Sequence, residues 1–289
     1  MPSVVIAAHN EESVIGACLD ALLAQGVRSN EVVVVANGCT DLTAGVARER
    51  GVVVIDLPEP GKAGALNAGD AVAIGYPRIY LDADIVVPPA GVASVLASFE
   101  RVPGALAAVP RRRVNTAGRA WPVRAYFAVN TRLPAFEEGL FGRGMIAVSA
   151  EGRSRFAEFP EMVADDLFLD AQFSKAEKAM TPDAEIVVDA PFATGDLLRR
   201  LVRVRRGNAQ MRAAAAAGAV EAEVRPSQRW AWLRVTVGHP TLWTSAVTYA
   251  VITAIAGSRA RRVADGAAAW GQDSSTRERS QAASDGGAP

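Results

Sequence analysis

The chain has 289 residues, half of them apolar, which is enough to bury the core of one large domain or of two small ones. Lysine and arginine together number 31, as do aspartate and glutamate, and this balance argues against a general nucleic-acid-binding protein, a class with a basic excess. The two cysteines, Cys18 and Cys39, have neither a metal-binding nor a redox spacing, so we expect free thiols in a reducing compartment.

Four apolar runs alternate with helical patterns over the first hundred residues. The runs predict strands at residues 3–8, 31–36, 52–57 and 78–84, and the intervening patterns predict helices at 11–26, 41–51, 64–75 and 90–100. Strands that are apolar throughout are typical of a parallel sheet with helices on both faces. The first half of the chain therefore predicts a doubly wound α/β architecture, in which ligands bind beyond the carboxyl ends of the strands.

The pattern is less regular after residue 105. Two further strands are expected at residues 105–110 and 145–150, and helices at 120–133 and 201–218. An uncharged helical segment follows at 239–257. The residues beyond Gly271 are rich in Ser, Gln, Asp and Gly, a composition typical of disorder.

Polar side chains gather where each of the four predicted strands ends. The carboxyl ends of parallel strands share one edge of the sheet, so we expect these side chains to form one cleft. In chain order they are His9, Asn10, Glu11, Asn37, Asp41, Lys62, Asn67, Asp82 and Asp84, and the same loops contain Gly38, Gly61 and Gly64.

Asp82 and Asp84 are two residues apart, so on an extended strand their carboxylates would share one face. Carboxylate oxygens on one side suit a hard divalent cation such as Mg²⁺ or Mn²⁺, which shares its ligand shell with water and substrate phosphates. The alternative is a turn in which the aspartates accept backbone hydrogen bonds. Lys62, in a glycine-flanked loop, could reach a phosphate as a point charge, or it could be a solvated lysine.

Four segments in register resemble a known family. They are "VVIAAHNEE", "VVVVANGCTDLTAGVA", "GKAGALNAG" and "YLDAD". Over residues 3 to 210 the chain resembles family 2 glycosyltransferases, which have the GT-A fold. The resemblance implies transfer of a sugar from a nucleotide-sugar donor, with inversion at the anomeric carbon. It also implies that Asp82 and Asp84 hold Mn²⁺ or Mg²⁺ on the donor diphosphate.

The resemblance implies further site residues. The acidic pair in "MVADDLFLD" matches the family's catalytic position, which makes Asp166 the expected base and Asp165 its support; the alternative is an acidic helix start. Arg205 and Arg206 match a basic motif near the donor diphosphate, or belong to a solvated or lipid-facing helix face. The turn 142–144 matches an acceptor-side loop less specifically. The expected donor-binding set is His9, Asn10, Glu11, Asn37, Lys62, Asn67, Asp82, Arg205 and Arg206.

One departure from the family pattern concerns the nucleotide. Many relatives have an acidic pair where this chain has Ala36 and Asn37, and the first acid often contacts the base. Asn37 could still hydrogen-bond a base edge, with a different donor and acceptor preference. The motifs leave open which nucleotide, sugar and acceptor are used.

Two other functions remain open from the sequence. A nucleotidyltransferase also binds Mg²⁺ through carboxylates on an α/β sheet, but it would have a Gly-rich, basic signature after the first strand, where this chain has "AHNEE". A non-catalytic nucleotide-sugar-binding scaffold at a membrane is the second alternative. The intact acidic residues Asp82, Asp84 and Asp166 argue against it.

The C-terminal part is a candidate for membrane association. No charged residue lies between Arg234 and Arg259, and arginines flank both ends of this segment. This pattern predicts an in-plane or re-entrant membrane helix, with a helix packed on the catalytic domain as the alternative. We expect a catalytic domain at 1–215, a helical membrane-associating segment at 216–264 and a disordered tail at 265–289. Without a signal peptide, the protein is expected in the cytoplasm, at the inner face of the plasma membrane, with a sugar or lipid-linked acceptor.

Overall fold

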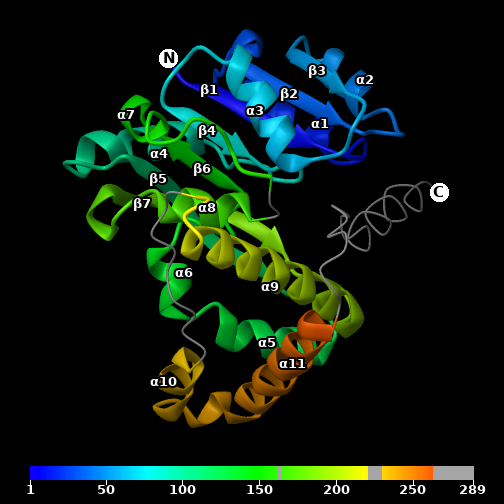
Figure 1. The fold of residues 1–289 in the computed structure, drawn as a ribbon, viewed down its shortest axis with the longest axis vertical. Coiled ribbons are helices and arrows are strands. Elements are labelled where there is room, and N and C mark those ends of the chain that lie inside the picture. The colour runs from blue at the N-terminus through cyan, green and yellow to red at the C-terminus, as the bar shows by residue number, and fades with distance from the viewer. Residues whose placement is uncertain (162–163, 221–229, 263–289) are drawn as a thin grey trace. The chain divides into compact units, whose positions relative to one another are not determined.

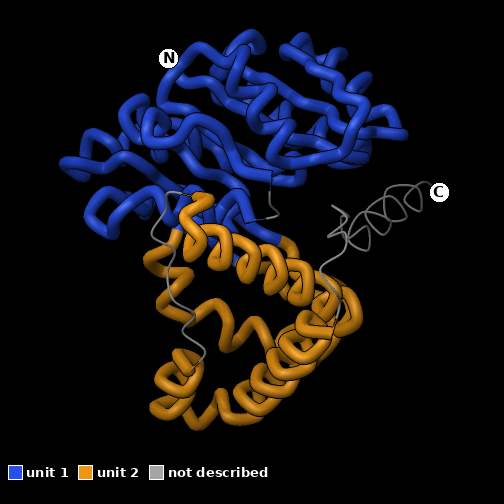
Figure 2. The backbone as a smooth tube through the Cα atoms, viewed as in Figure 1, with its two compact units in different colours: residues 1–113, 140–188 blue, residues 114–139, 189–289 orange. Residues whose placement is uncertain are grey.

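The structure is a computed structural model that describes residues 1–161, 164–220 and 230–262. The chain divides into two compact units (Figure 2). The first unit comprises residues 1–113 and 140–188, and the second comprises residues 114–139 and 189–289. The tail predicted at 265–289 lies outside the described residues. So do Arg225 and Arg229, two of the arginines that precede the uncharged segment. The predicted boundary near residue 215, between a catalytic domain and a membrane-associating segment, separates two functions and stays a prediction.

The first unit is built on a seven-stranded sheet with the strand order β3-β2-β1-β4-β6-β5-β7 (Figure 1). The strands are β1 (Ser3–Ala8), β2 (Val32–Asn37), β3 (Val53–Leu57), β4 (Arg78–Leu81), β5 (Ala107–Asn115), β6 (Met145–Val148) and β7 (Lys178–Asp189). The first four strands pair in parallel, whereas β6 is antiparallel to both β4 and β5. The expected mostly parallel sheet is confirmed, and its antiparallel strands lie on one side of β4.

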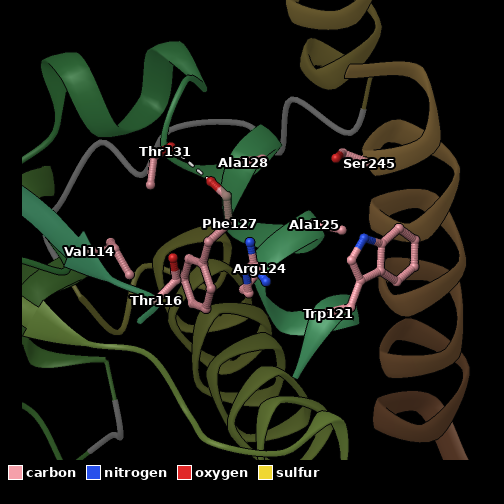
Figure 3. A pocket seen from close by; sticks show the side chains of 9 residues that line it. All are labelled: Val114, Thr116, Trp121, Arg124, Ala125, Phe127, Ala128, Thr131 and Ser245. Carbon is pink, nitrogen blue, oxygen red and sulfur yellow. Dashed lines mark hydrogen bonds between the residues drawn. The ribbon is translucent and has the colours of Figure 1, made fainter. Parts of the chain in front are cut away.

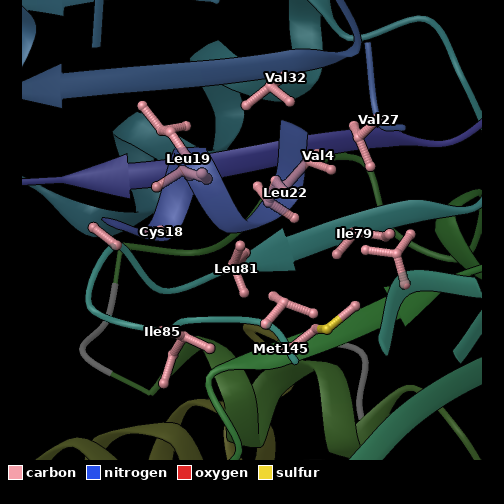
Figure 4. Packing of buried hydrophobic residues seen from close by; sticks show 14 of the residues in the cluster. Val4, Cys18, Leu19, Leu22, Val27, Val32, Ile79, Leu81, Ile85 and Met145 are labelled. Atoms are coloured by element: carbon pink, nitrogen blue, oxygen red, sulfur yellow. The ribbon is translucent and has the colours of Figure 1, made fainter. Parts of the chain in front are cut away.

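Helices cover both faces of this sheet, as the continuous apolar strands predict. The helices of the first unit are α1 (Ile15–Leu23), α2 (Thr43–Arg48), α3 (Lys62–Val72), α4 (Gly91–Arg101), α7 (Ala150–Arg153) and α8 (Asp165–Ala171), with 3-10 turns η1 (Ser29–Glu31) and η2 (Lys175–Glu177). On one face, Val4 packs with Leu19 and Leu22 of α1 (Figure 4). On the other face α3 packs closely against β1. Gly69 allows this close packing, since the Cβ atom of any other residue there would lie 2.4 Å from the Val5 side chain.

The second unit is helical. Its elements are α5 (Trp121–Asn130), α6 (Pro134–Glu138), α9 (Thr194–Ala216), α10 (Ala231–Val237), η3 (Pro240–Leu242) and α11 (Trp243–Arg262). Its core joins α5, α9 and α11, with the rings of Tyr126 and Tyr249 stacked at 4.9 Å. A hollow of about 380 Å³ between α5 and α11 is lined by Trp121, Arg124 and Ser245, among others (Figure 3).

The segment 216–264, expected to associate with a membrane, includes α10, η3 and α11. Most of its uncharged part lies in α11. One side of this helix is buried in the second unit, through Tyr249, Ile252 and Ala256. Across the described ranges, no helix has both the length and the apolar character needed to cross a bilayer. A helix in the membrane plane, which needs neither, stays a prediction.

Candidate active site

The chain turns at the end of β4, where Asp82 and Asp84 follow Leu81. The Asp82 N–H donates to the Gly144 carbonyl at 2.8 Å, and the Ile85 N–H donates to the Asp82 carbonyl at 3.2 Å. The expectation that both aspartates lie on an extended strand is therefore wrong, because the backbone turns at Asp82 to return the buried Ile85 to the core. The acidic pair still lies at the carboxyl end of a central parallel strand.

The acidic pair has the chemistry of a site for a divalent cation. Asp84 is exposed, and the Asp82 side chain is 45% exposed, so hard carboxylate oxygens face outward. In the described part of the chain, no group of three or more His, Cys, Asp or Glu side chains could hold a metal ion. A cation held by Asp82 and Asp84 would need further oxygen ligands from water and a bound diphosphate, as Mg²⁺ sites on substrates commonly do.

Lys62 links two acidic groups of the site. It begins α3, and its Nζ atom lies 2.9 Å from Oδ1 of Asp82 and 3.0 Å from Oδ2 of Asp165. Burial alone would lower the pKa of Lys62, but the carboxylates of Asp165 and Asp82 hold it well above its ordinary value. The Lys62 side chain is therefore not a solvated lysine, which was one of the two alternatives left open by the sequence. It lies next to the acidic pair, in contact with Asp82.

Asp166 has the properties of a general base. It lies in the first turn of α8, where its Oδ2 atom accepts a hydrogen bond from the Gly142 N–H at 3.0 Å. Burial, and then the neighbouring charge of Asp165, raise its pKa to about 6, while Lys62 opposes this rise. A carboxylate with this pKa is ionised at neutral pH yet more basic than an ordinary aspartate, as proton abstraction requires.

The backbone of the turn 142–144 forms hydrogen bonds with both Asp82 and Asp166. Gly142 donates to Asp166, and the Gly144 carbonyl accepts from the Asp82 N–H. Both glycines have a positive φ, and a Cβ atom at Gly144 would lie 2.5 Å from Ile85. Arg143 points into the fold, where its Nη1 atom donates to the Pro110 carbonyl and burial lowers its pKa to about 10. The sequence identified this turn only weakly; its two glycines were the available signal.

The loop after β1 is braced against the loop after β2. The Asn10 side chain accepts from the Thr40 N–H at 2.8 Å, and Asn10 has a φ of 54°. His9 Nδ1 lies 2.7 Å from the Asn37 carbonyl oxygen. Glu11 is buried, and its N–H donates to Thr43 Oγ1 at 2.7 Å. The sequence did not single out Thr40 or Thr43, although both lie within the segment "VVVVANGCTDLTAGVA".

Two asparagines of the expected donor-binding set use their amides inside the fold. Asn37 is fully buried; its Nδ2 donates to the Ala8 carbonyl at 2.7 Å, and its Oδ1 accepts from the Gly61 N–H at 3.0 Å. Asn67 exchanges two hydrogen bonds with the backbone of Phe159. These bonds hold the loop before Lys62 and the segment near Phe159 in place.

The two arginines of the expected set belong to the second unit. Arg205 and Arg206 lie on α9. Burial raises the pKa of Tyr126 and of Tyr249, and the charge of Arg205 opposes this rise. The guanidinium of Arg205 therefore lies near these tyrosines, in the core of the second unit. Their contact with a donor diphosphate stays a prediction.

Comparison with known proteins gives a family match. A family model described as "Glycosyl transferase family 2" matches residues 3–150, just over half of the chain, including Lys62, Asp82 and Asp84. None of the curated proteins matches the chain at a significant level.

Solved structures also match. The mannosyltransferase PcManGT from Pyrobaculum calidifontis, in complex with GDP-Man and Mn²⁺, is 20% identical, with a TM-score of 0.60 over 98% of this chain and 79% of that chain. Glucosyl-3-phosphoglycerate synthase from Mycobacterium tuberculosis, in complex with Mn²⁺, uridine-diphosphate-glucose and phosphoglyceric acid, is 22% identical, with a TM-score of 0.48 over 62% of this chain and 68% of that chain. TarS from S. aureus, in complex with UDP, is 16% identical, with a TM-score of 0.48 over 70% of this chain and 63% of that chain. The chain thus spans between 63% and 79% of the length of these structures, and the likeness to the first is one of fold.

Proposed function

The chain belongs to glycosyl transferase family 2 and is a glycosyltransferase, and we propose that it transfers a sugar from a nucleoside-diphosphate sugar to an acceptor hydroxyl with inversion. The observation that carries this proposal is the cluster of Lys62, Asp82, Asp165 and Asp166 at the carboxyl end of a parallel strand. The cluster supports the proposal because Asp82, one of the two proposed cation ligands, and Asp166, a carboxylate with a raised pKa, belong to one region of the first unit.

The chemistry assigned to these residues is a direct displacement. Asp166 accepts the proton of the acceptor hydroxyl, whose oxygen forms a bond to the anomeric carbon as the bond from that carbon to the diphosphate oxygen breaks. Asp82 and Asp84 would hold Mn²⁺ or Mg²⁺, whose charge stabilises the leaving nucleoside diphosphate. The bonding pair of electrons leaves with the diphosphate, and attack from the opposite side inverts the anomeric carbon.

The remaining residues of the expected set position these groups. Gly142 holds Asp166 through its N–H, and Asn37 holds the loop that precedes Lys62. His9 and Asn10, on the loop after β1, would border the nucleotide, and Arg205 and Arg206 would add positive charge near the diphosphate.

We also infer a place of action at the inner face of the plasma membrane, in cell-envelope or glycolipid synthesis. The uncharged segment that becomes α11, flanked by arginines, supports attachment to a membrane. A membrane location favours a lipid-linked or envelope acceptor over a small soluble one.

The test is hydrolysis of a panel of α-linked UDP- and GDP-sugars with Mn²⁺, in which water replaces the acceptor. Proton NMR follows the anomer that appears first. We expect release of nucleoside diphosphate together with the β-anomer, and a loss of about 10² or more in turnover for Asp166→Asn. First appearance of the α-anomer would contradict inversion.

Two variants make the hydrolysis test specific. Asp56→Asn, an equal change at an exposed position on β3, should keep the wild-type rate. If Asp165→Asn is the crippling change and Asp166→Asn is not, the base has been assigned to the wrong member of the pair.

If the protein binds donors but releases no diphosphate, it is a non-catalytic binder.

A further inference from the structure

The charge of the chain is unevenly divided between its two units. The residues of the first unit carry 14 basic and 21 acidic side chains, whereas those of the second carry 17 basic and 10 acidic ones. The described residues of the second unit alone include thirteen arginines and four acidic residues, and residues 230–262 contain no acidic residue. The neutral total therefore conceals a basic unit, which favours an anionic partner.

α11 carries a stripe of exposed apolar side chains. Its opposite side is buried in the core of the second unit. The stripe consists of Trp243, Val247, Val251 and Ile255, which are 60%, 66%, 51% and 38% exposed. These positions recur every four residues and so lie along one side of the helix. A contiguous exposed apolar stripe of this kind marks an interaction surface.

The stripe leads into positive charge. Arg262 follows Ile255 by seven residues and therefore lies on the same side of α11, next to Arg261. Both arginines are exposed. Tryptophan, at one end of the stripe, is enriched at the boundary between lipid head groups and acyl chains, and arginines, at the other end, are attracted to anionic head groups.

We propose that the α11 stripe docks on an anionic phospholipid surface, with its apolar side chains among the acyl chains and Arg261 and Arg262 at the head-group phosphates. The proposal rests on the membrane attachment proposed above, and it adds the face that binds and the charge of the lipid. A second copy of the chain is the less suitable occupant. Two parallel copies of this face would bring arginines against arginines, and in two antiparallel copies the arginines would meet no acidic residue of α11 either.

The test is co-sedimentation of the full chain with vesicles of phosphatidylglycerol and, separately, of phosphatidylcholine. We expect at least tenfold stronger binding to the anionic vesicles, and loss of that preference at high salt. Val247→Glu places a charge in the stripe and should weaken binding at least tenfold. Arg261→Gln combined with Arg262→Gln should weaken binding to the anionic vesicles tenfold or more, at roughly fivefold for each arginine.

The matched control is Ile74→Glu, the same kind of change at a 91% exposed position of the first unit, which should bind as the wild type does. Equal binding to both vesicle types, or equal behaviour of Val247→Glu and Ile74→Glu, overturns the proposal. A dimer seen by light scattering that Val247→Glu dissociates, without vesicle binding, shows instead that the stripe joins two copies. Donor hydrolysis needs no membrane, so active protein that ignores vesicles refutes this inference and the proposed place of action, and leaves the proposed sugar transfer standing.

Discussion

The Nζ atom of Lys62 lies 2.9 Å from the Oδ1 atom of Asp82, so a protein cation already occupies one carboxylate of the pair that we expect to hold a divalent ion. The same ammonium group reaches Asp165 at 3.0 Å. If Asp82 binds a divalent ion, as we propose, Lys62 would compete with that ion until a diphosphate offered the lysine another partner. This competition can be measured without any sugar transfer.

Replacing Lys62 with methionine should strengthen the binding of Mn²⁺ alone. The variant removes a positive charge that repels the ion and pairs with its ligand, and we expect an effect on the order of tenfold, from the interaction of charges near a protein surface. Free Mn²⁺ measured by electron paramagnetic resonance gives the affinity. Lys175→Met, on η2, is the matched control and should leave the affinity unchanged. Unchanged or weaker Mn²⁺ binding by Lys62→Met would show that Lys62 does not compete for Asp82.

The raised pKa of Asp166 predicts how stability depends on pH. Because this pKa is about 6 in the folded protein and about 4 in an unfolded chain, the folded state retains a proton that the unfolded state releases. The unfolding free energy of the wild type should therefore lose a contribution as pH rises from about 4 to about 6. Asp166→Asn lacks this loss, so its stability relative to the wild type should rise across that window. The rise is at most about 3 kcal/mol, at roughly 1.4 kcal/mol for each pKa unit.

Urea unfolding at several pH values measures this difference. A constant offset from the hydrogen bond that asparagine disturbs at Gly142 does not affect the slope. Lys62→Met should extend the wild-type loss to higher pH, because the lysine charge lowers the pKa of Asp166. A difference between Asp166→Asn and wild type that stays flat or falls from pH 4 to 7 would contradict the assignment.

Gly144 should be intolerant of a side chain. Its φ is 70°, which costs an alanine about 1–2 kcal/mol, and the added Cβ would also lie 2.5 Å from Ile85. Gly104 is the matched control, since its φ is 79° and no atom lies within 4 Å of an added Cβ. We expect Gly144→Ala to lower the free energy of unfolding by about 1–3 kcal/mol more than Gly104→Ala. Equal losses would mean that the turn moves freely away from Asp82.

Much of the first unit could be predicted because its central strands are apolar on both faces. The continuous runs identify β1 to β4, and parallel strands bring their polar ends to one edge. β7 could not be found in this way. Its sequence alternates buried and exposed positions, contains Pro182, and forms the last strand of the sheet order, where proline is tolerated.

The site could be predicted by residue type more readily than by contact. Asp82 and Asp84 carry their chemistry in the sequence, but the turn that holds them depends on a hydrogen bond to Gly144, which is distant along the chain. The pairing of Lys62 with Asp165 likewise depends on how α3 and α8 pack. The sequence alone does not show that the Asn37 amide is buried and bonded within the fold, because a buried asparagine and an exposed one look the same in a sequence.

The most direct test of the central claim, that Asp82 and Asp84 hold a cation on a nucleoside diphosphate, is calorimetric titration with UDP and GDP in Mn²⁺ and in EDTA. We predict that at least one nucleotide binds in Mn²⁺, and that EDTA or the Asp84→Asn change weakens this binding at least tenfold, whereas Asp56→Asn does not. Nucleotide binding that is equally tight in EDTA and in Asp84→Asn, or the absence of binding by the wild type in Mn²⁺, would contradict the claim.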